Sequence, residues 1–327
     1  LPISQLRGIG RLAQQIEFVG DGLFVFRHHF PRPQPPPFAP VTLRQVRYHI
    51  KETDVARDGF LNAGAHHLDH HVLTAFQPRQ VYAFAQAPAF GWRGDSSGIV
   101  KRGMAYFSRY YQRRDGLFRT LADCDGLALD EHALLYDQAF ALLGYAAAAA
   151  LGMGGEFEAR ALDLRRAIER HMGAADGSFC SGVESSDLRE SNPHMHLLEA
   201  HLAWAQIGRD PGWASGIRRI VDLALSRFIR ADSGVLGESY LANWQPAPGI
   251  AGRVIEPGHQ FEWAWLLLRC ERRYAVPLRA AALRLIDIGE RFGVCNGVAI
   301  KAIHDDFTVR DADARLWPQC ERLKAAL

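Results

Sequence analysis

Two stretches of the chain place a histidine three residues ahead of a glutamate. NPHMHLLEAHLAW contains His196 and Glu199, and EPGHQFEWAWLLLRC contains His259 and Glu262. Residues three apart on a helix share a face, so each motif directs an imidazole and a carboxylate the same way. Both motifs lie among Leu, Trp and Ala, where unpaired polar groups are costly to bury. One such pair is usually structural, but two in matching contexts predict a site for proton transfer near neutral pH.

Metal binding by His196, Glu199, His259 and Glu262 is the main alternative, because imidazole and carboxylate also ligate metals. The five cysteines are scattered without a C-x-x-C motif, which favours a reducing compartment and gives no zinc cage. The histidine-rich GAHHLDHH segment has no supporting thiol or acidic cluster, and we interpret it as an exposed patch. On the residues alone, metal binding stays open as the alternative to proton transfer.

The bulk composition excludes several classes of partner. The 327 residues carry a net charge of only +2, which gives no electrostatic case for nucleic acid or an anionic membrane. No uninterrupted apolar run reaches the roughly 18 residues of a membrane span. We expect a cytoplasmic protein that binds a small molecule.

The pattern of apolar residues predicts helix after helix from about residue 75 onward, and no convincing alternation predicts strands. In DEHALLYDQAFALLGY we expect Asp130 to cap the helix N-terminus. Residues 31–40 contain six prolines and cannot be helical. We therefore divide the chain into a Pro- and His-rich segment, 1–75, and an all-α domain, 76–327.

A polar or aromatic residue interrupts each of five apolar helices at a regular interval. The successive gaps are 57, 60, 63 and 58 residues. A period near 60 equals two helices with their loops, and such hairpins stack around a shared core. If the hairpins close into a ring, five residues lie around one central opening, here called the mouth: Arg79, Tyr136, His196, His259 and Trp317.

Through NPHMHLLEA and EPGHQFEWAWLL, supported by LYDQAF and WPQCERLKA, residues 77–327 resemble the N-acylglucosamine 2-epimerase superfamily. That superfamily includes aldose–ketose isomerases of the mannose isomerase type and cellobiose 2-epimerases. The resemblance implies an (α/α)6 barrel that acts on a monosaccharide or small sugar without a metal. Its chemistry removes the proton beside an open-chain sugar carbonyl and passes through a cis-enediol, which needs an acid–base group and oxyanion donors.

The resemblance also implies roles for individual residues. His259 matches an acid–base histidine of the family, and His196 and Glu262 resemble polar supports of its catalytic centre. The residues that resemble sugar ligands and pocket walls are Arg79, Tyr136, Asn192 and Trp317.

The chain departs from the family pattern at both ends. Residues 1–75 do not match the family's opening helices, and one further step of about 60 residues from Trp317 falls beyond Leu327. The resemblance places a second catalytic histidine on that later helix, so we expect about five of six hairpins and an incomplete catalytic pair. The leading expectation is mannose- or glucose-type isomerisation, with or without a phosphate on the sugar. A 2-epimerase and a non-catalytic homologue remain alternatives, and a homodimer is left open.

Overall fold

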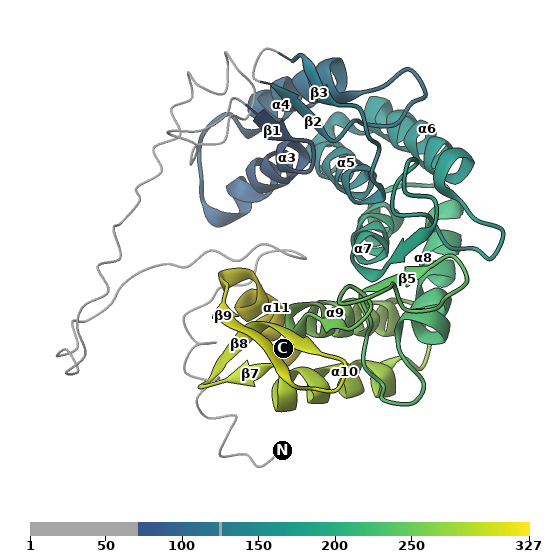
Figure 1. The fold of residues 1–327 in the computed structure, drawn as a ribbon. Helices are drawn as coiled ribbons and strands as arrows, with labels where there is room; N and C mark the ends of the chain where they lie inside the picture. The colour runs from purple at the N-terminus through teal and green to yellow at the C-terminus, as the bar shows by residue number, and fades with distance from the viewer. Residues whose placement is uncertain (1–70, 124–125) are drawn as a thin grey trace.

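The helices of the protein form two layers around an open ring (Figure 1). The computed structural model describes residues 71–123 and 126–327. The inner layer consists of α3 (Phe76–Gln86), α5 (Leu135–Ala148), α7 (Ser191–Ile207), α9 (Pro257–Tyr274) and α11 (Leu316–Ala326). The outer layer consists of α4 (Ser96–Tyr111), α6 (Gly154–Met172), α8 (Gly212–Leu223) and α10 (Arg279–Phe292). Each inner helix packs against the next inner helix, and among the described residues no helix lies between α3 and α11.

The apolar pattern of each helix decides its layer. Outer helix α8 buries one stripe that includes Trp213, Ile217 and Ile220, spaced for a single helical face. Inner helix α5 is buried almost all round, because inner neighbours and outer helices cover it together. This alternation of inner and outer helices confirms the predicted all-α barrel class, with five inner helices in the described part of the chain.

The stretch Leu135–Met172 is long and apolar enough to cross a membrane by length and composition. In the fold it is two helices, α5 and α6, because Gly152 breaks it with a φ of 90°. The two helices pack against each other, and 56% of the most apolar 18-residue window is buried inside the protein. The apolar character of this segment is therefore explained by its place in the core.

Short strands join the helices at one end of the ring, so the expectation of no strands was wrong. Three sheets form: β1 (His71–Leu73), β2 (Leu121–Asp123) and β3 (Ala128–Asp130); β4 (Leu188–Glu190) with β5 (Ser239–Leu241); and β6 (Val254–Ile255), β7 (Val294–Cys295), β8 (Val298–His304) and β9 (Val309–Ala314). All their pairings are antiparallel. Most of these strands have only two or three residues, which is too short to show an alternating pattern. Strand β8 is longer, but its buried residues do not alternate with exposed ones, so a search for period 2 misses it as well.

The expected helix cap at Asp130 is also wrong. Asp130 pairs with Leu121 in the β2–β3 ladder, and its carboxylate accepts the backbone N–H of His132 at 2.9 Å. Helix α5 begins five residues later, where the N–H of Leu135 donates to the carbonyl of Ser181 at 2.9 Å. A pairing with a distant loop thus replaces the local cap.

A repeated side-chain clamp ties four inner helices, α5, α7, α9 and α11, to the preceding loop. Gln260 accepts the N–H of Leu236 at 3.0 Å and donates to its carbonyl at 3.0 Å. Gln138 does the same with Phe118, and Gln319 with Ala299. The remaining clamp is an imidazole, because His194 Nε2 accepts the N–H of Phe179 at 3.1 Å. Two residues before each clamped position stands a glycine with positive φ: Gly116, Gly177, Gly234 and Gly297.

A buried carboxyl near the start of α5 makes stability depend on pH. Asp137 is 3% exposed, and burial raises its pKa to about 7. The Thr120 hydroxyl lies 3.0 Å from both the His132 carbonyl and the Asp137 carboxyl oxygen. Its one hydrogen can serve only one of them, so a protonated Asp137 completes the arrangement.

We expect Asp137→Asn to stabilise the protein above pH 7. The folded-state pKa lies above the unfolded value, so stability falls by about 1.4 kcal/mol per pH unit between pH 4 and pH 7. The amide abolishes that loss, and the gain in Tm over the parent should grow with pH. Thermal melts at pH 4 to 8 measure it. The matched control Asp130→Asn should show no such gain, because hydrogen bonds from His132 lower the pKa of Asp130.

Several predictions concern residues outside the described part of the chain. These are the extended Pro-rich stretch at 31–40 and the histidine patch His66, His67, His70 and His71, of which only the backbone of His71 is described. The division into segments 1–75 and 76–327 stays a prediction.

Candidate functional site

The N-terminal halves of the inner helices bring the repeat residues together in helix order. Arg79 of α3 donates to the Tyr136 hydroxyl of α5 at 3.0 Å, and its guanidinium lies 4.0 Å from the Phe140 ring centroid. The Tyr136 ring meets the His196 imidazole of α7 edge-on, with centroids 5.2 Å apart. Burial raises the pKa of Tyr136, and Arg79 opposes that rise. Residues predicted from spacing alone are therefore direct neighbours along this arc.

The two His-x-x-Glu motifs do not form two separate pairs. His196 Nδ1 lies 3.3 Å from a Glu199 oxygen, as helical spacing predicts. The second glutamate, Glu262, lies 3.9 Å from the same Nδ1, and the partner of His259 is a different residue. The circular arrangement of the inner helices directs the Glu262 carboxyl toward α7. The glutamate of the second motif therefore lies beside the histidine of the first motif.

His259 instead forms an ion pair with Glu238, which lies just before β5. The His259 Nδ1 and a Glu238 carboxylate oxygen are 2.9 Å apart, and both side chains are about nine-tenths buried. Burial alone lowers the pKa of His259, but the Glu238 charge and hydrogen bond raise it to about 9. His259 sits in the first turn of α9, as predicted, and its ring lies 5.3 Å from that of Trp317 on α11. At neutral pH this histidine is an imidazolium.

His196 has the opposite protonation. Burial is the main cause that lowers its pKa, although Glu199 opposes the shift, so the imidazole is neutral. The site thus places one charged and one neutral imidazole on adjacent helices. Groups whose environments push their pKa values apart suit complementary roles in proton transfer.

A lysine neutralises the carboxyl cluster beneath these histidines. Lys324 of α11 is 7% exposed, pairs with Glu321 at 2.5 Å and lies 4.1 Å from the centroid of the Trp265 ring. Burial and the Glu321 charge raise the pKa of Glu262, whereas Lys324 opposes the rise. Burial favours the neutral acid of Glu199 too, but the His196 hydrogen bond and nearby cations lower its pKa. One carboxyl is therefore protonated and the other ionised.

Asn192 lies one turn before His196 on α7, as its spacing predicts. Its side-chain carbonyl oxygen is buried and has no hydrogen-bond partner among the described residues. A buried acceptor without a partner is costly, so this oxygen suits a hydroxyl donor from a ligand.

Three site residues were missed by sequence reasoning: Glu238, Glu321 and Lys324. Glu238 follows the Gly234 loop, and a search for the 60-residue recurrence of such glycine turns could have pointed to that loop. Glu321 and Lys324 stand in CERLKAAL, where their i,i+3 spacing looks like an ordinary surface pair.

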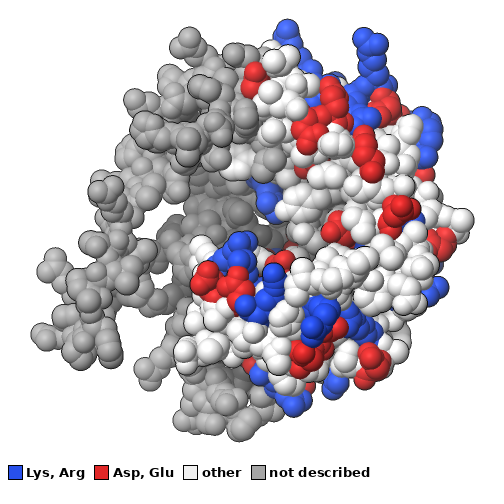
Figure 2. Space-filling model, viewed as in Figure 1, with Lys and Arg blue, Asp and Glu red and all other residues white. Residues whose placement is uncertain are grey.

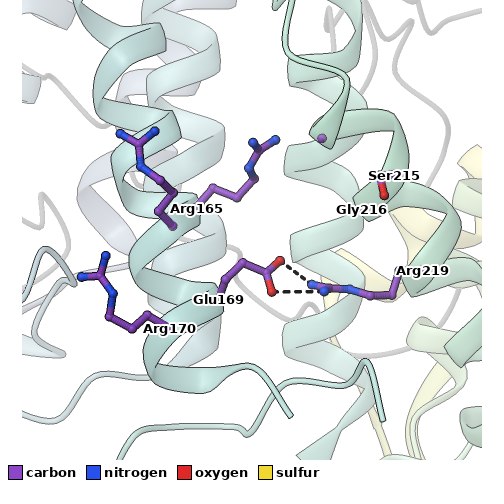
Figure 3. A pocket seen from close by; sticks show the side chains of 8 residues that line it. Arg165, Glu169, Arg170, Ser215, Gly216 and Arg219 are labelled. Atoms are coloured by element: carbon purple, nitrogen blue, oxygen red, sulfur yellow. Dashed lines mark hydrogen bonds and ion pairs between the residues drawn. The ribbon is translucent and has the colours of Figure 1, made fainter. Parts of the chain in front are cut away.

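Two cavities lie elsewhere on the helices. One of about 230 Å³ reaches Glu199 from the C-terminal ends of the inner helices, beside Arg269. The other, of about 560 Å³, lies between outer helices α6 and α8 (Figure 3). Its Arg219 and Glu169 face each other and form two hydrogen bonds, at 2.6 and 3.1 Å. This second cavity holds an ion-pair network and none of the site residues.

The surface carries no single-sign field on the face seen in Figure 2, where acidic and basic side chains are interspersed. This distribution agrees with the small net charge of the chain.

Known proteins share both the sequence and the fold. The mannose-6-phosphate isomerase of Rhizobium meliloti (strain 1021) is 45% identical over 262 residues, covering 77% of this chain and 67% of the relative. The D-mannose isomerase of Pseudomonas cannabina pv. alisalensis is 28% identical over 214 residues, covering 59% of this chain and 50% of the relative. The chain therefore spans between half and about two thirds of the length of these two relatives.

Solved structures support the barrel. A crystal structure of D-mannose isomerase superposes with a TM-score of 0.73 at 24% identity, over 82% of this chain and 72% of that one. Cellobiose 2-epimerase from Bacillus thermoamylovorans B4167 superposes with a TM-score of 0.69 at 16% identity, over 78% of this chain and 70% of that one. At these identities the likeness shows the shared fold.

The family profile described as N-acylglucosamine 2-epimerase (GlcNAc 2-epimerase) matches residues 57–327, more than half of the chain. The expected resemblance is confirmed, and the homologues are carbohydrate isomerases and epimerases by name. The chain belongs to the N-acylglucosamine 2-epimerase family.

Proposed function

We propose that the protein interconverts a mannose- or glucose-type aldose with its ketose by proton transfer through a cis-enediol. The observation that carries the proposal is the adjacent pair of buried histidines, His259 charged and His196 neutral, at the mouth of the inner helices. The 45% identity to a protein named mannose-6-phosphate isomerase supports isomerisation over epimerisation.

His259 enters the reaction as a proton donor, because Glu238 keeps it charged at neutral pH. It gives its proton to the ring oxygen as the ring opens, while the anomeric hydroxyl loses its proton to solvent, and the neutral imidazole then accepts the proton from C2. Returning that proton to C1, as the O2 hydroxyl proton is transferred to O1, yields the ketose. Return of a proton to the other face of C2 yields the epimer and needs a second base. A group that both donates and accepts a proton serves both directions of transfer.

The remaining residues bind and orient the sugar in this proposal. Arg79 and Tyr136 offer polar groups at one wall, and Trp317 offers an apolar face beside His259. The unpaired Asn192 oxygen accepts a sugar hydroxyl. Glu262 supports the developing oxyanion as a donor, because its raised pKa favours a protonated carboxyl. The neutral imidazole of His196 donates its Nδ1–H to the Glu199 carboxylate, so its Nε2 accepts a sugar hydroxyl.

Proton NMR of the purified protein with sugars in D₂O tests the function. We expect mannose, glucose or mannose 6-phosphate to yield the ketose, with solvent deuterium incorporated at the reacting carbon. Accumulation of C2 epimers from cellobiose or an N-acyl sugar, with no ketose, would indicate a 2-epimerase instead. No reaction with any of these sugars would reject the proposed activity and favour a non-catalytic homologue.

A metalloenzyme is the second candidate, because His196, Glu199 and Glu262 offer ligand atoms within 4.8 Å of one another. Lys324 acts against it, since its ammonium already interacts with both carboxyls and competes with a bound cation. We expect activity to survive EDTA. Stoichiometric zinc, manganese or iron by elemental analysis, with turnover lost on chelation, would favour the metal mechanism.

A further inference from the structure

Glu238 gathers three hydrogen-bond donors around one buried carboxylate. One oxygen accepts the Ser191 hydroxyl at 3.0 Å and lies 2.9 Å from His259 Nδ1. The other oxygen accepts the backbone N–H of Glu256 at 3.1 Å. The donors come from the start of α7 and from the start of α9, so Glu238 joins the two helices that carry the histidines.

The backbone fixes where this carboxylate lies. Strands β4 and β5 pair with Glu190 opposite Ser239, and the Ser191 N–H donates to the Glu238 carbonyl at 2.9 Å. The Gln260 clamp holds Leu236, two residues before Glu238, by two hydrogen bonds. The segment is therefore held on both sides of Glu238, and it is held by the same helix that carries His259.

We propose that Glu238 is the positioning residue that fixes the tautomer, orientation and charge of His259 for catalysis. This inference rests on the proposed function. With Nδ1–H donated to Glu238, the hydrogen bonds among the described residues leave Nε2 for the substrate. A carboxylate fixed by two other donors cannot follow a rotating ring, so the ring must adopt the orientation that Glu238 sets.

Other charged groups also face His259, but they do not contact it as Glu238 does. Glu256 caps its own helix and Glu262 lies on it, Glu321 lies on α11, and His196 lies on α7. The largest of the effects that favour the charged imidazole comes from Glu238. Removing its charge should therefore change the protonation of His259 more than any other single substitution.

The test compares Glu238→Gln with Glu238→Asp and with Glu190→Gln. Glu190 is the matched control, because it lies on the partner strand β4, one residue from Ser191, and bonds Ser239 at 3.4 Å. The His259 titration is followed by NMR with ¹⁵N-labelled histidine, assigned with a His259 variant. The pH dependence of kcat and KM is measured for each protein.

In Glu238→Gln we expect the His259 pKa to fall by one to three pH units from about 9, the range for loss of an adjacent opposite charge. The alkaline limb of kcat should shift to lower pH by the same amount, and kcat at pH 9 should fall at least about fivefold with little change in KM. Glu238→Asp should keep most of the titration, and Glu190→Gln should leave it unchanged.

The proposal is overturned if His259 titrates alike in the parent and in Glu238→Gln, or if kcat falls without a shift of the alkaline limb. Should Glu238→Gln fail to fold, Glu238→Asp decides instead: its carboxylate is one methylene shorter, so the His259 pKa should fall by a fraction of a pH unit, and an unchanged titration would overturn the proposal. If the parent protein turns over no sugar, the proposed function fails, while the NMR titration still decides whether Glu238 controls His259.

Discussion

His259→Asn lowers kcat for sugar isomerisation at least about 100-fold, the usual scale of general acid–base catalysis. Asparagine keeps a donor for Glu238 and most of the volume, but it has no nitrogen that can take up and release a proton near neutral pH. NMR time courses with the sugar that the parent protein converts fastest measure the change in kcat. A thermal melt of each protein checks that the variant is folded, so that the loss of kcat is assigned to the chemical step.

His194→Gln is the control for that substitution. His194 is fully buried near the start of α7, as His259 is near the start of α9. His194 acts as a clamp on Phe179, and glutamine fills that role in the other repeats. Its turnover should stay close to the parent's. Near-normal kcat in a folded His259→Asn protein would remove His259 from the mechanism.

Lys324→Met lowers the free energy of unfolding by about 3–5 kcal/mol, the usual result of removing one partner of a buried ion pair. Lys324 is the cation that interacts with Glu199, Glu262 and Glu321 together, and methionine supplies volume without charge. Urea unfolding at pH 7 measures the loss. The loss should shrink toward pH 5, because the carboxyls then bind protons and need no counter-charge.

A second lysine provides the matched control. Lys301 pairs with Asp311 between β8 and β9, and both side chains are about one third exposed. Lys301→Met should therefore cost at most about 1 kcal/mol. Adding Glu321→Gln to Lys324→Met should recover part of the loss, because Glu321 is the carboxylate that pairs with the Lys324 ammonium. Equal effects of the two lysine substitutions would show that burial of Lys324 does not make its charge essential.

The sequence was sufficient for the part of the site that repeats. Arg79, Tyr136, His196, His259 and Trp317 occupy equivalent places on successive inner helices, and a spacing near 60 residues follows directly from two helices and their loops. That spacing predicts which residues share the mouth, because every repeat has nearly the same length. It does not predict which residues pair across the mouth.

The pairing depends on the angle between neighbouring helices, and no local pattern encodes that angle. Glu262 was expected to serve His259, three residues away, but lies 3.9 Å from His196 on α7. Glu238 comes from a loop 21 residues before its partner His259. The contact of Glu262 with His196 forms only after neighbouring hairpins have stacked, and that of Glu238 with His259 only after the loop has folded onto α9, so neither could be predicted from spacing along one helix.

The repeated clamps have a consequence for how the chain reaches its fold. Each clamp joins residues only 15 to 24 positions apart, so closing it costs little chain entropy. Every hairpin can therefore acquire its turn and its helix entry before it meets a neighbour. Ordering then spreads between adjacent repeats, as along a one-dimensional lattice, and can begin at any of them. Substituting leucine for one clamp residue should accelerate hydrogen exchange mainly in its own hairpin, while distant hairpins keep their protection.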